Sequence, residues 1–147
     1  MSEQSGALTP RLQEIIADFG YIVGSEKLEY LLEFAEALPP LPEWLHDNRE
    51  EMDEVHECMS PVFIFAEKDE NNKLNYHFDI PPEAPTVRGF AEILRSGLQG
   101  VAPEQVLAIP DMFYLEMGLG SVLTGQRLNG IGAILAHMKT LAREKMA

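Results

Sequence analysis

The stretch PVFIFAEKDENNKLNYHFDI, residues 61–80, decides the fold. Residues 61–66 form a continuous run of apolar, β-branched and aromatic residues, which is typical of a buried strand. Residues 74–80 alternate between apolar and polar, so a second strand turns one face to the core. The polar residues 69–72 favour a turn between them. Two strands this close in sequence are expected to pair antiparallel, and residues 55–57 are a candidate third strand.

Helical patterns flank this hairpin on both sides. Thr9 and Pro10 have the form of an N-cap and a first helical residue, and Ser25 is expected to cap a second helix that ends before Pro39. Residues 41–54 read as a loop with one helical turn around Trp44, and helical stripes return over 87–98, 103–108, 111–117 and 131–141. We predict an α+β fold, in which N- and C-terminal helices pack on one side of a small antiparallel sheet of two or three strands.

Length and composition limit the classes of protein. The 147 residues, 46% of them apolar, predict a single domain over residues 1–147, with residues 1–8 flexible. No apolar run approaches the ~20 residues that cross a bilayer, and the first residues lack a secretory pattern, so we expect a cytoplasmic protein. Acids exceed bases by 24 to 11, giving a net charge of −13. That excess argues against binding to nucleic acid or to an anionic membrane.

The negative charge is concentrated directly before the single cysteine. Residues 43–57 hold one base, Arg49, and seven acids: Glu43, Asp47, Glu50, Glu51, Asp53, Glu54 and Glu57. Such a segment is either a solvated loop that keeps the protein soluble or a docking surface for a basic patch on a partner.

Cys58 is the only cysteine, which excludes an internal disulfide and a cysteine-rich metal site. A free cysteine is most often a small buried hydrophobic residue. Its polar flanks instead suggest a thiol at the mouth of a strand. His56, two residues earlier, makes a Cys–His hydrolase dyad conceivable. A metal site built from His56, Cys58 and His77 is a weaker alternative, since the spacing is not that of a ligand set.

Arg127 stands where the last predicted helix begins. A base at a helix N-terminus is mildly unfavourable for the helix dipole. Arg127 is therefore either a solvated side chain or a residue that holds an anion or a thiolate.

Three stretches taken together resemble one known family. They are ECMSPVFI (57–64), PEAPTVRGF (82–90) and RLNGI (127–131). In this order and around the only cysteine, they are similar to SufE, the sulfur acceptor of iron–sulfur cluster assembly. The stretch at 82–90 and the segment IPDMFY (109–114) are most similar to the actinobacterial branch of that family. The resemblance covers about residues 9–143.

The resemblance implies a function and its residues. Cys58 would accept persulfide sulfur from a SufS-like cysteine desulfurase, stimulate that enzyme and pass the sulfur to a SufBCD-like scaffold, with Arg127 in support. The protein would be a carrier rather than an enzyme, without a metal or cofactor of its own, since the pyridoxal phosphate belongs to the desulfurase. Glu57, where many members have glycine, is expected to raise the thiol pKa unless a cation such as Arg127 offsets it. The alternatives are an acidic adaptor with Cys58 in the core, or a small cysteine hydrolase.

Overall fold

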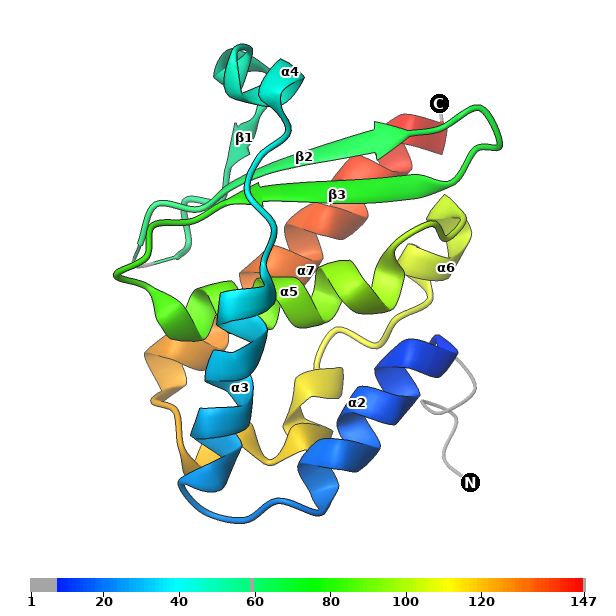
Figure 1. Cartoon of the computed structure of the whole chain (residues 1–147). Coiled ribbons are helices and arrows are strands. Elements are labelled where there is room, and N and C mark those ends of the chain that lie inside the picture. Colours follow the sequence, from blue (N-terminus) through cyan, green and yellow to red (C-terminus); the bar gives the residue numbers. More distant parts are fainter. Residues whose placement is uncertain (1–7, 59, 147) are drawn as a thin grey trace.

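The protein has two layers, a small sheet and a set of helices beneath it (Figure 1). The computed structural model describes residues 8–58 and 60–146. The strands are β1 (Asp53–Glu54), β2 (Phe63–Lys68) and β3 (Leu74–Asp79). The helices and 3-10 helices are α2 (Pro10–Gly20), α3 (Glu26–Ala37), α4 (Glu43–His46), η1 (Arg49–Glu51), α5 (Pro85–Leu98), α6 (Pro103–Leu107), η2 (Phe113–Met117), η3 (Leu119–Ser121) and α7 (Gly125–Met146). The predicted α+β class is confirmed.

The hairpin of β2 and β3 forms as predicted, and the two strands pair antiparallel along their whole lengths. The Asp69 carboxylate closes the turn, because it accepts the backbone N–H groups of Asn71 and Lys73 at 2.8 and 3.0 Å. Asn72 takes the left-handed conformation, with φ of 61°, that asparagine tolerates better than most residues.

The third strand lies earlier than predicted. β1 pairs antiparallel with β2 over Asp53–Glu54, so the sheet order is β1-β2-β3. The prediction of a strand over 55–57 is wrong, because the chain turns there: the Cys58 N–H donates to the Val55 carbonyl at 3.4 Å.

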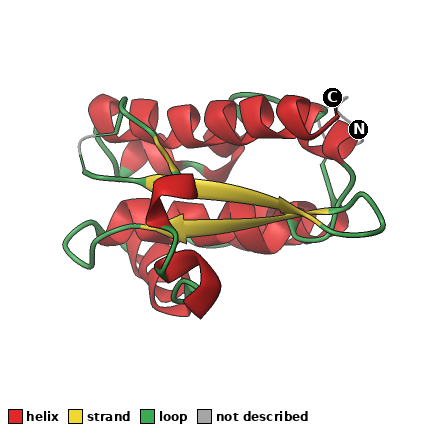
Figure 2. Ribbon diagram, turned by 90° about the horizontal axis from the view of Figure 1, so that it is seen from above, coloured by secondary structure: helices red, strands yellow, loops and turns green. Residues whose placement is uncertain are grey.

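The two faces of the sheet differ. On β2, Ile64 and Ala66 are buried against the helices, whereas Phe63 and Phe65 lie half-buried on the opposite face. The continuous apolar run is therefore not a strand buried on both sides, since its aromatic residues face away from the helical layer. Helices α5 and α7 pack against β3 and β2 and cover the inner face, as predicted (Figure 2).

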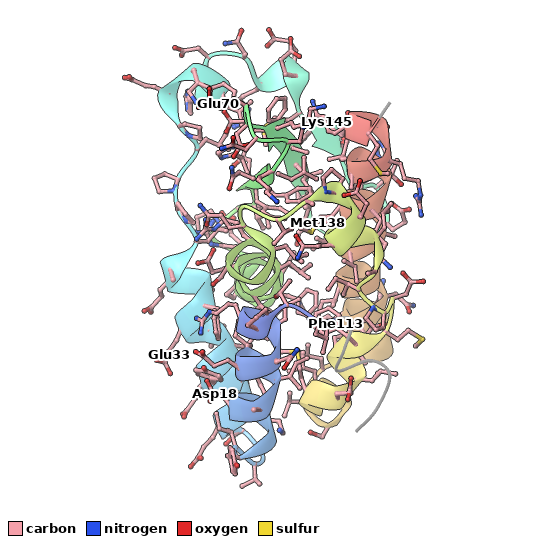
Figure 3. All side chains as sticks on the ribbon, turned by 90° about the vertical axis from the view of Figure 1, so that its right-hand side faces the viewer. Asp18, Glu33, Glu70, Phe113, Met138 and Lys145 are labelled. Atoms are coloured by element: carbon pink, nitrogen blue, oxygen red, sulfur yellow. The ribbon has the colours of Figure 1, made fainter. Side chains whose placement is uncertain are left out.

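The helical layer packs closely around α5. A Cβ atom at Gly89 would overlap the Leu31 carbonyl of α3, and one at Gly97 would overlap the Leu12 side chain of α2. These two glycines therefore set the distance of α5 from its neighbours. Figure 3 shows Phe113 and Met138 in the interior, whereas Glu33 and Glu70 point outward.

Of the two predicted caps, one is confirmed. The Thr9 hydroxyl accepts the Leu12 N–H at 3.2 Å, which caps α2. The prediction for Ser25 is wrong, because its backbone is already helical and its side chain makes no capping bond. Over the two described ranges, no helix combines the length and the apolar character that a membrane span needs.

Candidate functional site

Cys58 lies in the loop that joins β1 to β2. The two ends of this loop are held together, because the Val55 N–H donates to the Val62 carbonyl at 2.8 Å. Both valines are buried, at 1% and 0% exposure. Met59, which follows the cysteine, lies outside the described residues. The thiol is therefore carried on a short loop whose base is fixed in the core.

The thiol faces the first half of α7. Cys58 is half-buried and packs against the edge of the hydrophobic core. Its Sγ donates to the Gly130 carbonyl at 3.6 Å, across 72 residues of sequence. This is a long, weak hydrogen bond, so the loop tip rests on α7 rather than being locked to it.

The surroundings keep the thiol protonated. Burial, and after it the neighbouring Glu57 carboxylate, raises the pKa of Cys58 from an ordinary 9.0 to about 11. The expected effect of Glu57 is confirmed, although burial contributes more. Among the described residues, no cation lowers this pKa to offset the two effects.

Arg127 lies one turn before Gly130 on α7 and is exposed. Its guanidinium donates to the Thr86 hydroxyl at 3.0 Å, and its backbone N–H donates to the Thr124 hydroxyl at 3.3 Å. Within the two described ranges it makes no ion pair with a carboxylate. The sequence suggested Arg127 as support for the thiol, but the hydrogen bonds of Arg127 go to Thr86 and Thr124 rather than to Cys58. Thr86 was not identified from the sequence, although it lies within one of the quoted motifs.

A shallow cavity of about 210 Å³ opens beside this arginine. Its lining combines apolar side chains with one guanidinium and two hydroxyls; the lining residues are Leu28, Pro85, Thr86, Val122, Leu123, Thr124 and Arg127. The first turns of α7 therefore contact the thiol at Gly130 and line this cavity at Arg127.

The Cys–His dyad does not form. The His56 side chain is 80% exposed, and its Nδ1 lies 3.8 Å from a carboxylate oxygen of Glu54. The thiol hydrogen bond goes to Gly130 instead. The geometry therefore does not support a hydrolase.

The suggested metal site does not form either. Residues 8–58 and 60–146 contain no group of three His, Cys, Asp or Glu side chains that could hold a metal ion. His77 lies on the outer face of the sheet, where its Nε2 is 3.0 Å from Glu67 Oε1. His77 is therefore paired with Glu67 and does not share a metal site with Cys58.

The acidic segment 43–57 is a fixed surface rather than a simple loop. All seven of its acids are exposed, and it contains α4, η1 and β1. Trp44 packs edge-on against Phe65 and His77, with ring centroids 5.7 and 5.6 Å apart. Arg49 forms an ion pair with Asp79 and lies over Phe63. The sequence predicted the helical turn at Trp44 but not these anchors on the sheet.

A solved structure shares this fold. The solution structure of a hypothetical protein from Thermus thermophilus superposes with a TM-score of 0.82 at 36% identity, covering 95% of this chain and 98% of that one. The fold thus defines a class of small α+β domains, here with one half-buried thiol on the loop before β2.

The family model "SufE: Fe-S metabolism associated domain" matches residues 13–142, and the chain belongs to the SufE family. A SufE-like protein of Mycobacterium tuberculosis, named as uncharacterised, is 42% identical over 138 residues, covering 94% of this chain and 95% of that protein. A Plasmodium vivax protein named "Cysteine desulfuration protein SufE" is 26% identical over 142 residues, covering 95% of this chain and 55% of that protein. The resemblance seen in the sequence is confirmed.

Proposed function

We propose that the protein is a sulfur carrier that takes persulfide sulfur onto Cys58 from a SufS-like cysteine desulfurase and delivers it to a SufBCD-like iron–sulfur scaffold. The observation that carries the proposal is the position of the only cysteine, at the tip of a short loop that rests on α7. Membership of a family of Fe–S metabolism supports it. The name of the Plasmodium relative supports a desulfurase as the partner.

The transfer is a thiol exchange on the outer sulfur of a persulfide. The Cys58 thiolate attacks that sulfur, the S–S bond of the desulfurase breaks, and its cysteine leaves as a thiolate. The net change converts one desulfurase persulfide and one Cys58 thiol into one desulfurase thiol and one Cys58 persulfide. No external oxidant or reductant is needed. The desulfurase is cleared for another turnover, so the carrier also acts as its activator.

The resting thiol is not ready for this attack. With a pKa of about 11, fewer than roughly one thiol in a thousand is ionised near neutral pH. Burial is the main cause, so movement of the loop tip away from α7 would lower the pKa and supply the thiolate. Among the described residues, the Gly130 carbonyl is the one hydrogen-bond partner of the Cys58 side chain, so this weak bond and the packing at the core edge are what oppose that movement. We expect docking on the desulfurase to draw the loop out.

Arg127 is proposed as a positioning residue at the docking face. Its exposed guanidinium is oriented by Thr86 and lies on the same helix turn that leads to Gly130. The acidic segment 43–57, fixed by Trp44 and Arg49, is proposed to meet a basic patch of the partner. The chain itself holds no cofactor in this proposal. We place the reaction in the cytoplasm, where a single thiol stays reduced.

The test is intact mass spectrometry after incubation with a cysteine desulfurase and free cysteine. The wild type is expected to gain the mass of one sulfur atom, and Cys58→Ser is expected to gain none. Equal gains in both would disprove Cys58 as the acceptor.

The half-burial of Cys58 keeps the acidic adaptor as a second candidate. The adaptor predicts that Cys58→Ala still stimulates the desulfurase fully. The carrier predicts that this stimulation is lost.

A further inference from the structure

Helix α7 approaches the Cys58 thiol at a residue without a side chain. Gly130 is buried, and its carbonyl oxygen lies 3.6 Å from Cys58 Sγ. A Cβ atom at position 130 would lie 3.7 Å from that Sγ and 3.8 Å from the Cys58 Cα. Apart from chain neighbours and the helix backbone, no other atom of the described residues comes within 4 Å of this Cβ position. The glycine therefore leaves a small space directly beside the sulfur.

We infer that this space, bounded by Gly130 and by Sγ and Cα of Cys58, receives the outer sulfur of the Cys58 persulfide. We call it the outer-sulfur seat. The inference rests on the proposed function, because it assigns a place to the sulfur that the carrier holds. It makes Gly130 a positioning residue that shelters the cargo when the loop returns to α7.

Bond lengths narrow the directions open to the outer sulfur. An S–S bond is ~2.05 Å long. A second sulfur placed along the 3.6 Å line to the Gly130 carbonyl oxygen would stop roughly 1.5 Å from it, which is a severe overlap. A second sulfur directed at the missing Cβ would stop roughly 1.65 Å from the position that an alanine Cβ takes, a position that glycine leaves empty. This direction keeps the outer sulfur against α7, whereas a sulfur that points away from the helix loses the cover of α7.

An alanine at position 130 should disturb the persulfide form of Cys58 but not its thiol form. Its Cβ would touch the thiol at 3.7 Å, an ordinary van der Waals distance, so the sulfur-free protein should keep its geometry. The same Cβ would occupy the seat, so the outer sulfur must turn away from α7. Gly125, the first residue of the same helix, has nothing within 4 Å of its Cβ position. Gly125→Ala is therefore a matched control.

The experiment measures how long the bound sulfur survives. Wild type, Gly130→Ala and Gly125→Ala are loaded with a desulfurase and cysteine and, in parallel, with inorganic polysulfide, which needs no docking. Cyanide is then added; it removes the outer sulfur as thiocyanate and leaves the Cys58 thiol. Intact mass spectrometry follows the loss, and melting temperatures confirm that all three are folded.

We expect Gly130→Ala to lose its sulfur several-fold faster than the wild type and Gly125→Ala, which should match each other. The unloaded thiols of all three should react with iodoacetamide at equal rates. If loaded Gly130→Ala keeps its sulfur as long as the wild type, the seat is disproved while the carrier function stands. If the wild type takes up no sulfur from the desulfurase, the proposed function fails, and the seat with it.

Discussion

Two adjacent segments before β2 are held in different ways. The acidic segment through β1 is fixed to the sheet by the Trp44 ring and by the Arg49–Asp79 ion pair. The loop that follows is held at its base by the backbone bond between Val55 and Val62. Its tip at Cys58 is held on α7 by a weak sulfur hydrogen bond and by packing at the core edge. The acidic segment is therefore a platform anchored on the sheet by side chains, whereas the thiol beside it has a single weak polar contact with the helix.

The largest effect on sulfur uptake is expected from removing the Cys58 thiol. Cys58→Ala should abolish sulfur uptake and stimulation of the desulfurase. The melting temperature should change little, because the half-buried side chain makes one long hydrogen bond. Desulfurase turnover and thermal unfolding measure the two effects. Persistent stimulation would instead favour the adaptor.

The second largest effect is expected from pH: raising it should increase the reactivity of the Cys58 thiol. In the folded protein, the alkylation rate of Cys58 should keep rising toward a pKa of about 11, whereas in the denatured chain it should level off above 9.0. Because folding raises this pKa, the stabilising contribution of the protonated thiol is present below pH 9 and is lost as the pH rises toward 11. Iodoacetamide kinetics in buffer and in urea measure this difference. Equal midpoints would show that the loop tip does not rest on α7 in solution.

Arg127→Ala comes third. Loss of one charged hydrogen-bond donor worth about 1.5 kcal/mol should slow sulfur uptake roughly tenfold. The stability should change by less than about 0.5 kcal/mol, because the side chain is exposed. Arg143→Ala, near the other end of α7 and also exposed, is the control and should leave the rate unchanged. A proportional loss of rate and stability would make Arg127 a structural residue.

Part of the fold and of the candidate site could be predicted from the sequence. Period-two alternation predicted β3, and uniqueness together with the flanking motif singled out Cys58. The Gly130 contact could not be predicted, because it joins positions 72 residues apart. The same holds for Trp44 on His77 and for Arg127 on Thr86, which depend on how distant elements pack. The alternation of buried and half-buried residues along β2 could not be seen in the sequence, because aromatic residues on its outer face are also apolar.

A substitution in the anchored acidic segment should affect stability rather than sulfur uptake, and by a smaller amount. Trp44→Ala removes two edge-on aromatic contacts and should lower the free energy of unfolding by about 1 kcal/mol. At saturating desulfurase, sulfur uptake should stay close to that of the wild type. Urea denaturation and uptake kinetics measure the two properties. A large loss of uptake without a loss of stability would show that Trp44 itself contacts the partner.

The smallest effect is expected from salt. If the acids of segment 43–57 attract a basic partner patch, stimulation of the desulfurase at subsaturating carrier should weaken as ionic strength rises. The carrier concentration for half-maximal stimulation should increase, while the maximal rate changes less. A concentration that does not depend on salt would argue against docking through this segment.

A single-turnover transfer tests most directly whether Cys58 is the sulfur acceptor. A desulfurase that carries one persulfide sulfur, freed of cysteine, is mixed with an equal amount of this protein, and both are weighed by intact mass spectrometry at successive times. The desulfurase is expected to lose one sulfur as this chain gains one, with the added mass on the peptide that contains Cys58. A desulfurase that keeps its sulfur, or a gain on any other peptide, would contradict it.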